Sequence, residues 1–375
     1  MQKIRFVCLD IHSDKIAVAI VEPDCEQRFL GVIPNREDSV RRMIRKLGDP
    51  KSLRICYEAG PTGFVPYLQL TAMGVECDVV APTLMPVKSG DRVKTDRRDA
   101  EKLARCHRAS DLTKVWVPDV AHEVLRDLAR ARECALRDEL RAKHCFGKFL
   151  LRHGKRRSDY LKAVWTTKHM KWIKTEVQFE QHAQEVALAD YVHEVEHAQM
   201  RVELLNLAIQ EAAESAPPQM RAVMDGLQTL RGIAELTAIV AELGQISRFE
   251  GAKQLMAYNG LVPSEYSTGN KTAHGSIAKT GNAHLRRVVM QAAWAYQYRP
   301  WLGGEILKRQ AEASAEVREI SWKAQNRLHM RYQKLLSRGK NKNQIVTAVG
   351  RDLLGFVWAI GVAVEREMPV APAAA

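Results

Sequence analysis

The sequence has 375 residues and a formal net charge of +13 at pH 7, from 57 Lys and Arg against 44 Asp and Glu. Hydrophobic residues make up 46% of it, which is enough to build cores, and the length suits two or three domains. The composition therefore excludes a disordered chain, and the excess positive charge favours a polyanionic partner such as DNA or RNA.

The cysteine pattern and the hydropathy pattern narrow the class further. Seven cysteines are scattered along the chain and form no Cys-x-x-Cys pair, so neither a disulfide framework nor a zinc site is indicated. No stretch of about 18 apolar residues occurs, and the first residues lead directly into a predicted strand. We therefore expect a cytoplasmic protein with no membrane span and no export signal.

The N-terminal part of the chain predicts a mixed α/β domain. Its predicted strands are residues 4–9, 15–21, 28–33, 53–57 and 75–80, and its predicted helices are residues 36–47 and 64–73. Three adjacent strands followed by alternating helices and strands suit the ribonuclease H type of fold. In that fold a mixed sheet presents acids from its first strand, a later parallel strand and a flanking helix.

A further helix is predicted to begin within the segment Lys-Thr-Asp-Arg-Arg-Asp-Ala, residues 94–100. Its acids, Asp96 and Asp99, are three residues apart, so they share one helix face and can converge on one point. Two adjacent carboxylates repel each other unless a proton or a cation lies between them. The same turn carries three cations suited to phosphate, Lys94, Arg97 and Arg98. A solvated helix face with ordinary salt bridges is the alternative interpretation of this segment alone.

Two other acids stand at the ends of predicted strands. Asp10 ends the first strand and Glu58 ends the fourth, so both are carried to a sheet edge where functional loops gather. With Asp96 and Asp99 they make four acids able to hold one or two Mg²⁺ ions, since hard cations prefer oxygen ligands. Two metals about 4 Å apart can stabilise the entering and the leaving oxygen of a phosphodiester displacement. Taken singly, Asp10 can be a turn residue and Glu58 a strand-end charge.

From Asp119 onward the pattern changes to long helices, the first of which Asp119 can cap. Cations interleaved with tryptophans between residues 148 and 174 predict a stacking surface for nucleic acid; the alternative is a solvated face with core tryptophans. Between residues 188 and 212 apolar side chains alternate at spacings of three and four, which predicts a coiled-coil seam. That seam either folds back on the preceding helix or dimerises.

The C-terminal part combines a hairpin, a polar loop and more helices. Residues 226–243 resemble the phosphate-binding helix-hairpin-helix, with Ala234 in place of its second glycine. The loop that ends at Gly269 carries the hydroxyls of Ser267 and Thr268, although hydroxyls in such loops are mostly turn formers. Basic residues beyond it are expected to contact phosphate: Lys271, Lys279, Arg286 and Arg287. A later basic cluster is a candidate RNA or DNA contact, and the alternative is a solvated helix end.

Several motifs together resemble the DEDD transposases of bacterial insertion sequences, recombinases guided by a structured RNA that the element encodes. They are the order Asp10, Glu58, Asp96, Asp99, the Leu-x-x-x-x-Gly-Ile hairpin, Gly260-Leu261-Val262-Pro263, Lys279-Thr280-Gly281-Asn282 and Leu285-Arg286-Arg287. The resemblance covers nearly the whole chain. It implies a RuvC-like catalytic domain over residues 1–118, a helical coiled-coil region over 119–218, a mainly α-helical transposase domain over 219–365 and a flexible tail over 366–375.

The resemblance also implies a mechanism and partners. A loop hydroxyl attacks DNA while the four acids of another subunit hold Mg²⁺, and the resulting ester conserves the phosphodiester energy for rejoining. The family's serine stands immediately before the loop glycine, where this chain has Thr268, so Ser267 and Thr268 both remain candidates. The implied partners are donor and target double-stranded DNA, the guide RNA, and further copies of the chain in a dimer or tetramer.

Two other functions stay open on the sequence alone. A metal-dependent endonuclease of the Holliday-junction type would use the same acids with water and would need no loop hydroxyl. A non-catalytic RNA-binding scaffold would need the basic surfaces only. An ATPase of the actin and sugar-kinase type is disfavoured, because the segment after Asp10 lacks a phosphate-loop glycine.

Overall fold

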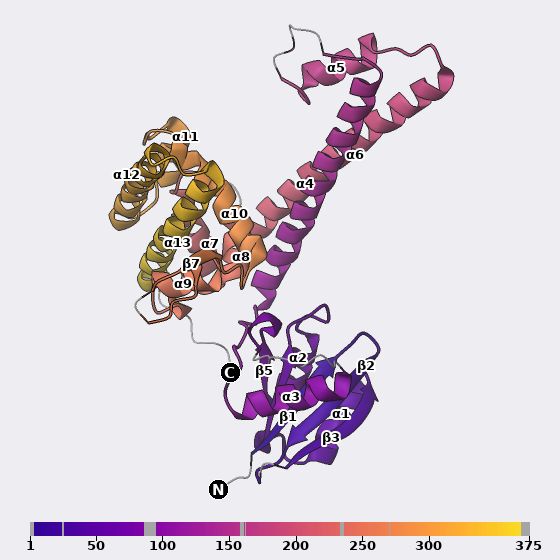
Figure 1. Ribbon diagram of the computed structural model, residues 1–375, viewed down its shortest axis with the longest axis vertical. Coiled ribbons are helices and arrows are strands. Elements are labelled where there is room, and N and C mark those ends of the chain that lie inside the picture. The colour runs from indigo at the N-terminus through magenta and orange to yellow at the C-terminus, as the bar shows by residue number, and fades with distance from the viewer. Residues whose placement is uncertain are drawn as a thin grey trace. The chain divides into compact units, whose positions relative to one another are not determined.

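The computed structural model describes residues 4–24, 26–85, 95–157, 161, 163–232, 236–269 and 271–368. Lys94, the hairpin turn that contains Ala234 and the end of the predicted tail lie outside the described residues. The chain divides into two compact units, Met1–Pro118 and Asp119–Ala375 (Figure 1).

The first unit contains a five-stranded mixed sheet with the strand order β3-β2-β1-β4-β5. Its strands are β1 (Arg5–Ile11), β2 (Lys15–Val21), β3 (Gln27–Pro34), β4 (Leu53–Glu58) and β5 (Glu76–Val80). The first three strands pair antiparallel, whereas β4 pairs parallel with both β1 and β5. The five predicted strands are confirmed, and the mixed sheet is consistent with an RNase H-like domain.

Helices cover both faces of this sheet. They are α1 (Glu37–Leu47), α2 (Val65–Ala72) and α3 (Asp96–Arg108), with short 3₁₀ turns η1 (Pro50–Ser52) and η2 (Pro82–Leu84). Leu9 and Tyr57 share a core with α1 and α2, whereas Cys8 and Cys56 share a core with α3. Because side chains alternate along a strand, Asp10 and Glu58 lie on the same face as Cys8 and Cys56, which is the face that α3 covers (Figure 1).

A buried ion pair joins His107 of α3 to Asp78 of β5. His107 is 9% exposed, and its Nε2 lies 3.2 Å from Asp78 Oδ2, while Lys114 Nζ lies 2.8 Å from Asp78 Oδ1. Burial lowers the pKa of His107, but the hydrogen bonds to Asp78 and to Cys56 outweigh it and raise the pKa to about 9. The imidazolium and the carboxylate therefore stabilise each other between α3 and β5.

The second unit is helical except for one small hairpin. Its helices are α4 (Val120–Arg152), α5 (Thr167–Glu176), α6 (His182–Glu214), α7 (Pro218–Gln228), α8 (Leu236–Leu243), α9 (Ala252–Tyr258), α10 (Ala283–Ala293), α11 (Gly304–Gln310), α12 (Ala315–Ser337) and α13 (Lys342–Glu367). Two 3₁₀ turns, η3 (Ile246–Arg248) and η4 (Trp294–Gln297), and two strands, β6 (Pro263–Glu265) and β7 (His274–Ile277), complete it. Asp119 caps α4 by accepting a hydrogen bond of 2.9 Å from the backbone N–H of His122.

The long helices α4 and α6 form an antiparallel hairpin (Figure 1). Arg132 donates to Asn206 at 2.5 Å, and Arg201 donates to Asp138 at 2.8 Å, so the two helices run in opposite directions. Leu188 and other residues of the predicted seam are buried. Of the two arrangements that the seam allowed, the structure has the fold-back on α4; coiled-coil packing in the strict sense stays a prediction.

The core of the second unit surrounds α13. Leu353, Val357 and Ile360 are 0% exposed, and the helix contacts α7, α9, α10 and α12. Among the described helices, α13 is the one long and apolar enough to cross a membrane by length and composition, yet 50% of its apolar window is buried inside this unit. Gly361 lets η3 approach closely, since a Cβ there would lie 2.3 Å from a side-chain atom of Ile246. The burial pattern is that of a core helix.

The raised pKa of His107 predicts a pH-dependent first unit. Its ordinary pKa is 6.5, so the stabilisation is fully present below about pH 6.5 and is lost as the pH rises through about 9, at a cost of up to about 3 kcal/mol. Hydrogen exchange of the β1 and β4 amides, corrected for intrinsic rates, should show falling protection over this range. His107→Gln should remove the slope; equal slopes in both proteins would contradict this account.

Candidate metal centre and nucleophile loop

The start of α3 places two acids beside the sheet edge. Thr95 caps the helix by accepting a hydrogen bond of 3.3 Å from the backbone N–H of Arg98, and its carbonyl accepts one of 2.9 Å from Asp99. The cap fixes where the helix begins, so Asp96 and Asp99 both fall in its first turn. The carboxylates can then converge, as their spacing predicts.

Asp96 meets Asp10 across the end of β1. Ligand atoms of Asp10, His12 and Asp96 all lie within 4.8 Å of one another. His12 Nε2 lies 3.4 Å from Asp10 Oδ2 and 3.6 Å from Asp96 Oδ1. Lys15 Nζ lies 2.6 Å from Asp96 Oδ2. Two carboxylates therefore share a small space with an imidazole and an ammonium group.

The pKa values of the two acids shift in opposite directions, that of Asp10 upward and that of Asp96 downward. Burial raises the pKa of Asp10, and the Asp96 and Asp99 carboxylates raise it further, while His12 opposes the shift. The hydrogen bond from Lys15 is the largest cause that lowers the pKa of Asp96. Asp10 thus interacts with both acids of α3, and the cluster attracts positive charge.

Glu58 lies beside Asp10 in the sheet register. The parallel ladder pairs Leu9 with Tyr57, so the next residue of each strand, Asp10 and Glu58, follows on the face towards α3. Among the described residues, the structure brings Asp10 and Asp96 together with His12, and the group whose ligand atoms all lie within 4.8 Å of one another includes neither Glu58 nor Asp99. A joint role of all four acids stays a prediction.

Sequence reasoning missed His12 and Lys15 as members of this cluster. In the sequence, His12 falls between the predicted strands 4–9 and 15–21, and Lys15 is the first residue of the second of these strands. The turn is so short that His12 donates its backbone N–H to the Lys15 carbonyl at 2.8 Å, which returns both side chains to the end of β1. The short connection between the two predicted strands was the feature of the sequence that could have indicated these two residues.

The predicted phosphate contacts of α3 differ in their surroundings. Arg97 Nε donates to Glu101 at 2.9 Å, and its guanidinium lies 5.6 Å from the Phe29 ring centroid. The Arg98 side chain is exposed. Phosphate binding by these residues stays a prediction.

The loop that carries Ser267 and Thr268 is the hairpin between β6 and β7. Backbone bonds of 3.0 and 3.2 Å join Thr268 and Lys271 in both directions, and Gly269 takes a left-handed φ of 59° in the turn. Ser267 Oγ donates to Glu265 Oε1 at 2.6 Å. Both hydroxyl residues and Lys271 are exposed. The contact with Glu265 distinguishes Ser267, and sequence reasoning did not identify it.

Arg286 stabilises the base of this loop through hydrogen bonds to backbone carbonyls. Its Nη1 donates to the carbonyl of Asn259 at 2.8 Å and lies 3.4 Å from that of Thr280, and burial lowers its pKa. A Cβ at Gly281 would lie 1.9 Å from the Tyr258 carbonyl oxygen, so this crossing of two chain segments requires glycine. Arg286 lies among backbone carbonyls, whereas Lys279 is exposed.

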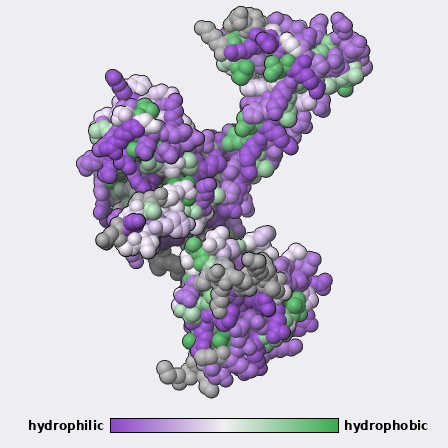
Figure 2. All heavy atoms as spheres, viewed as in Figure 1, coloured by the Kyte–Doolittle hydropathy of each residue, from purple (hydrophilic) through white to green (hydrophobic). Residues whose placement is uncertain are grey.

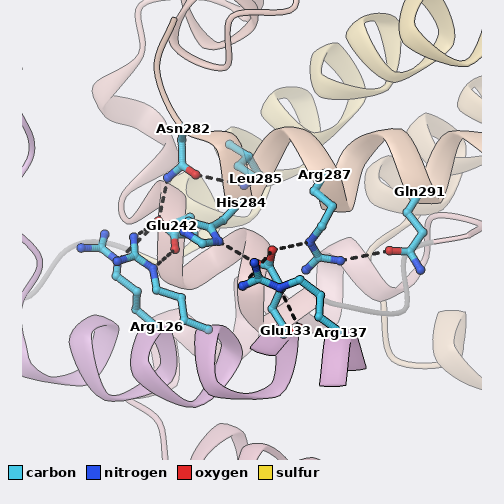
Figure 3. Close-up of polar contacts among 10 residues, drawn as sticks. Arg126, Glu133, Arg137, Glu242, Asn282, His284, Leu285, Arg287 and Gln291 are labelled. Carbon is cyan, nitrogen blue, oxygen red and sulfur yellow. Dashed lines mark hydrogen bonds and ion pairs between the residues drawn. The ribbon is translucent and has the colours of Figure 1, made fainter. Parts of the chain in front are cut away.

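The N-terminus of α10 is anchored to α4 through a buried carboxylate (Figure 3). Glu242, 2% exposed, accepts two bonds from Arg130 at 2.8 and 3.1 Å and one from Asn282 Nδ2 at 2.6 Å. Arg126 Nε lies 3.5 Å from the same carboxylate. Asn282 Oδ1 also caps α10 by accepting the Leu285 N–H at 3.0 Å. One side chain thus connects the cap of α10 with the buried charge.

A second carboxylate, that of Glu133 in α4, contacts the first turns of α10 (Figure 3). Glu133 lies 2.6 Å from His284 Nδ1 and 3.1 Å from Arg287 Nε, and Arg287 Nη1 donates to Gln291 at 3.1 Å. Burial raises the pKa of Glu133, but His284 and Arg287 lower it by more, so the Glu133 carboxylate stays ionised. Arg287, a predicted phosphate contact, is paired within the protein.

The predicted helix-hairpin-helix is only partly described. Gly232 has a φ of 81°, and a Cβ there would lie 2.5 Å from the Ala292 carbonyl oxygen. The close approach to α10 gives this glycine a packing role; the hairpin turn after it lies outside the described residues.

Comparison with known proteins defines the class. A transposase family model of DEDD type matches residues 7–154, and the model of the IS116/IS110/IS902 transposase family matches residues 224–303. The chain is 41% identical over 361 residues to a putative transposase, y4qE, of Sinorhizobium fredii, covering 95% of this chain and 88% of that protein. It is 28% identical over 347 residues to the transposase of insertion sequence IS1533 of Leptospira borgpetersenii, covering 91% and 99%. The chain belongs to the IS116/IS110/IS902 (IS110-type) family of insertion-sequence transposases.

The buried carboxylate of Glu242 should dominate the stability of the second unit. Glu242→Gln leaves Arg126 buried without its counter-charge, so we expect a loss of about 3 kcal/mol in the free energy of unfolding. Urea unfolding followed by tryptophan fluorescence measures it, because six of the seven tryptophans lie in this unit.

Glu319→Gln is the matched control. Glu319 pairs with Lys323 at 3.0 Å on the surface of α12, where both side chains are 69% exposed. Its loss should cost less than about 0.5 kcal/mol. Equal destabilisation by the two substitutions would show that the Glu242 network is not a stabilising element.

Proposed function

We propose that this transposase is an RNA-guided DNA recombinase that cuts and rejoins DNA through a covalent protein–DNA intermediate. The observation that carries the proposal is the convergence of the Asp10 and Asp96 carboxylates with the His12 imidazole and the Lys15 ammonium group at the edge of the sheet. We further assign the first unit to the RuvC-like class, the α4–α6 hairpin to a coiled-coil region and residues 219–365 to the transposase domain. The protein would act in the cytoplasm as a dimer or tetramer on donor and target duplexes, with an active site that subunits can share.

The donor set fits Mg²⁺. Carboxylate oxygens are the ligands that hard cations prefer, and Asp10, Glu58, Asp96 and Asp99 supply them. The ammonium of Lys15 at 2.6 Å from Asp96 marks a place where the cluster already accepts positive charge. One or two bound Mg²⁺ ions would neutralise charge on the scissile phosphate and acidify the attacking hydroxyl. The protein contributes the spacing of the carboxylates, which the register of β1 and β4 and the Thr95 cap determine.

The geometry of the hairpin favours Ser267 over Thr268 as the nucleophile. The hydrogen bond to Glu265 orients the Ser267 hydroxyl, whereas Thr268 has its backbone held on both sides and carries an extra methyl group. In the proposed step Ser267 Oγ bonds to the phosphorus, the bond from phosphorus to the 3′ oxygen breaks, and the released strand ends in a 3′ hydroxyl. The 5′ phosphate remains on the serine, so reversal of the step on a new strand rejoins DNA without ATP.

Trapping of the intermediate tests this chemistry. The full chain incubated with target DNA, guide RNA and Mg²⁺ should form an adduct that survives a denaturing gel. Ser267→Ala should abolish the adduct, Thr268→Ala should retain it, and the double substitution should lose it. Loss in Thr268→Ala alone would make threonine the nucleophile. Cleaved DNA with free ends and no adduct from the wild-type chain would instead support the endonuclease.

Metal binding tests the acid cluster independently. Asp96→Asn should weaken Mn²⁺ binding, measured by isothermal titration, by about tenfold or more and should abolish DNA cleavage. Asp111→Asn, at an exposed acid of the same unit, is the control and should change neither. Transposition at the wild-type rate by Asp96→Asn would refute a catalytic role and favour the RNA-binding scaffold.

A further inference from the structure

Most of the excess positive charge of this chain lies in one short segment. Residues 141–180 contain eleven Lys and Arg against three Asp and Glu, a net charge of +8 out of +13 for all 375 residues. The segment covers the end of α4, the connection to α5, and α5 itself. A charge of this density in about a tenth of the chain favours a polyanion at this place.

The same segment has a core of its own at the outer end of the α4–α6 hairpin. Phe146, Trp172 and Ile173 are buried there together with residues of α6. Figure 2 shows apolar side chains gathered at this end among hydrophilic ones. Because the tip packs independently, it can present a shaped surface instead of a flexible basic tail.

A cavity of about 460 Å³ opens in this surface. Its aromatic wall is a run of three rings: the ring centroids of Trp165 and His169 are 5.5 Å apart, and those of His169 and Trp172 are 5.7 Å apart. Trp165 has a φ of 62°, an unfavourable backbone conformation for a residue with a side chain, and such conformations cluster at ligand sites. Burial and then Arg157 lower the pKa of His169, so this ring stays neutral and able to stack.

The rim of the cavity is cationic and apolar. Lys155, Arg156 and Arg157 line it, together with Leu151 and Val164, which are 61% and 48% exposed. Arg157 donates to the Leu161 carbonyl at 2.9 Å. The Lys155 ammonium lies 5.1 Å from the centroid of the Phe179 ring, a contact that still leaves its N–H groups able to donate to a phosphate, and Arg156 is exposed. An aromatic wall with cations at its edge suits a nucleobase whose phosphates lie outside the cavity.

We propose that this cavity, at the tip of the helical hairpin, binds an unpaired base of a looped RNA, with flanking phosphates on Lys155 and Arg156. A two-fold contact with the same tip of a second copy of the chain is disfavoured, because it would bring the same cations against one another. Duplex DNA keeps its bases stacked and paired, whereas RNA loops expose unpaired bases to aromatic side chains. The choice of RNA rests on the proposed guide-RNA function; the base site itself rests on the cavity.

Fluorescence anisotropy with the full chain tests the site. The probes are an RNA hairpin with an adenine loop, a blunt RNA duplex of equal phosphate number, a DNA duplex, and a DNA hairpin with the same loop. The wild-type chain should prefer the RNA hairpin. Trp165→Leu should weaken binding of the RNA hairpin about tenfold and leave binding of the duplexes unchanged.

A charge variant makes the test independent of any packing defect at Trp165. Lys155→Gln with Arg156→Gln should make the salt dependence of RNA hairpin binding shallower by about 1.4 in logarithmic slope, which corresponds to two phosphate contacts. Arg45→Gln with Lys46→Gln, at two exposed cations of α1, is the matched control and should leave the slope unchanged.

The outcomes separate this site from the proposed reaction. The base site would be overturned if Trp165→Leu weakened the binding of every probe equally, or weakened none. It would also be overturned if the Lys155/Arg156 variant and the Arg45/Lys46 control changed the salt dependence of RNA hairpin binding by the same amount. A DNA hairpin bound at least as tightly as the RNA hairpin would overturn the assignment to RNA. If loop binding depends on Trp165 but the wild-type chain never forms a DNA adduct, the recombination chemistry fails and the tip site stands.

Discussion

Repulsion between carboxylates held close together is the constraint on which the first unit depends. Asp10 arrives from a strand and Asp96 from a helix, and their ligand atoms lie within 4.8 Å in a group that includes His12. Such an arrangement survives only because rigid elements determine both positions and because positive charge compensates them. The parallel ladder of β1 and β4, the Thr95 cap and the Lys15 contact supply these conditions. The same arrangement makes the site receptive to a divalent cation.

In the second unit, buried polar contacts hold the base of the hairpin that carries the proposed nucleophile. The tip with Ser267 is exposed, but the loop is closed at its base by Arg286 on two backbone carbonyls. Immediately beyond it, Asn282 connects the cap of α10 to the buried Glu242 (Figure 3). A buried charge is costly unless it is fully paired, so this network resists rearrangement. Rigidity at the base allows an exposed hydroxyl to be presented in a defined place.

The sequence predicts the parts of the molecule that depend on local pattern. The five strands follow from β-rich runs between turns, and the four acids stand where those strands and the α3 cap place them. The paired states of Arg286 and Arg287 were not predictable, because Arg287 pairs with Glu133, more than 150 residues earlier, and Arg286 with backbone carbonyls. A basic side chain looks the same in sequence whether it faces phosphate or an internal carboxylate. The fold-back of α6 on α4 was equally open, since an apolar seam is covered by either arrangement.

The distribution of charge relates the acid cluster of the first unit to the basic tip of the α4–α6 hairpin. A cluster of carboxylates repels phosphates, so under the proposed function affinity for nucleic acid has to come from elsewhere in the chain. Within the second unit, Arg286 and Arg287 near the hairpin have partners inside the protein, whereas Lys271 and Lys279 are exposed. The tip of the α4–α6 hairpin instead concentrates eight net positive charges, with Lys155 and Arg156 on the rim of an aromatic cavity. In the proposed reaction, placing the nucleic-acid-binding charge away from the acid cluster would let the cluster keep the negative potential needed for a metal ion, without loss of affinity for a polyanion.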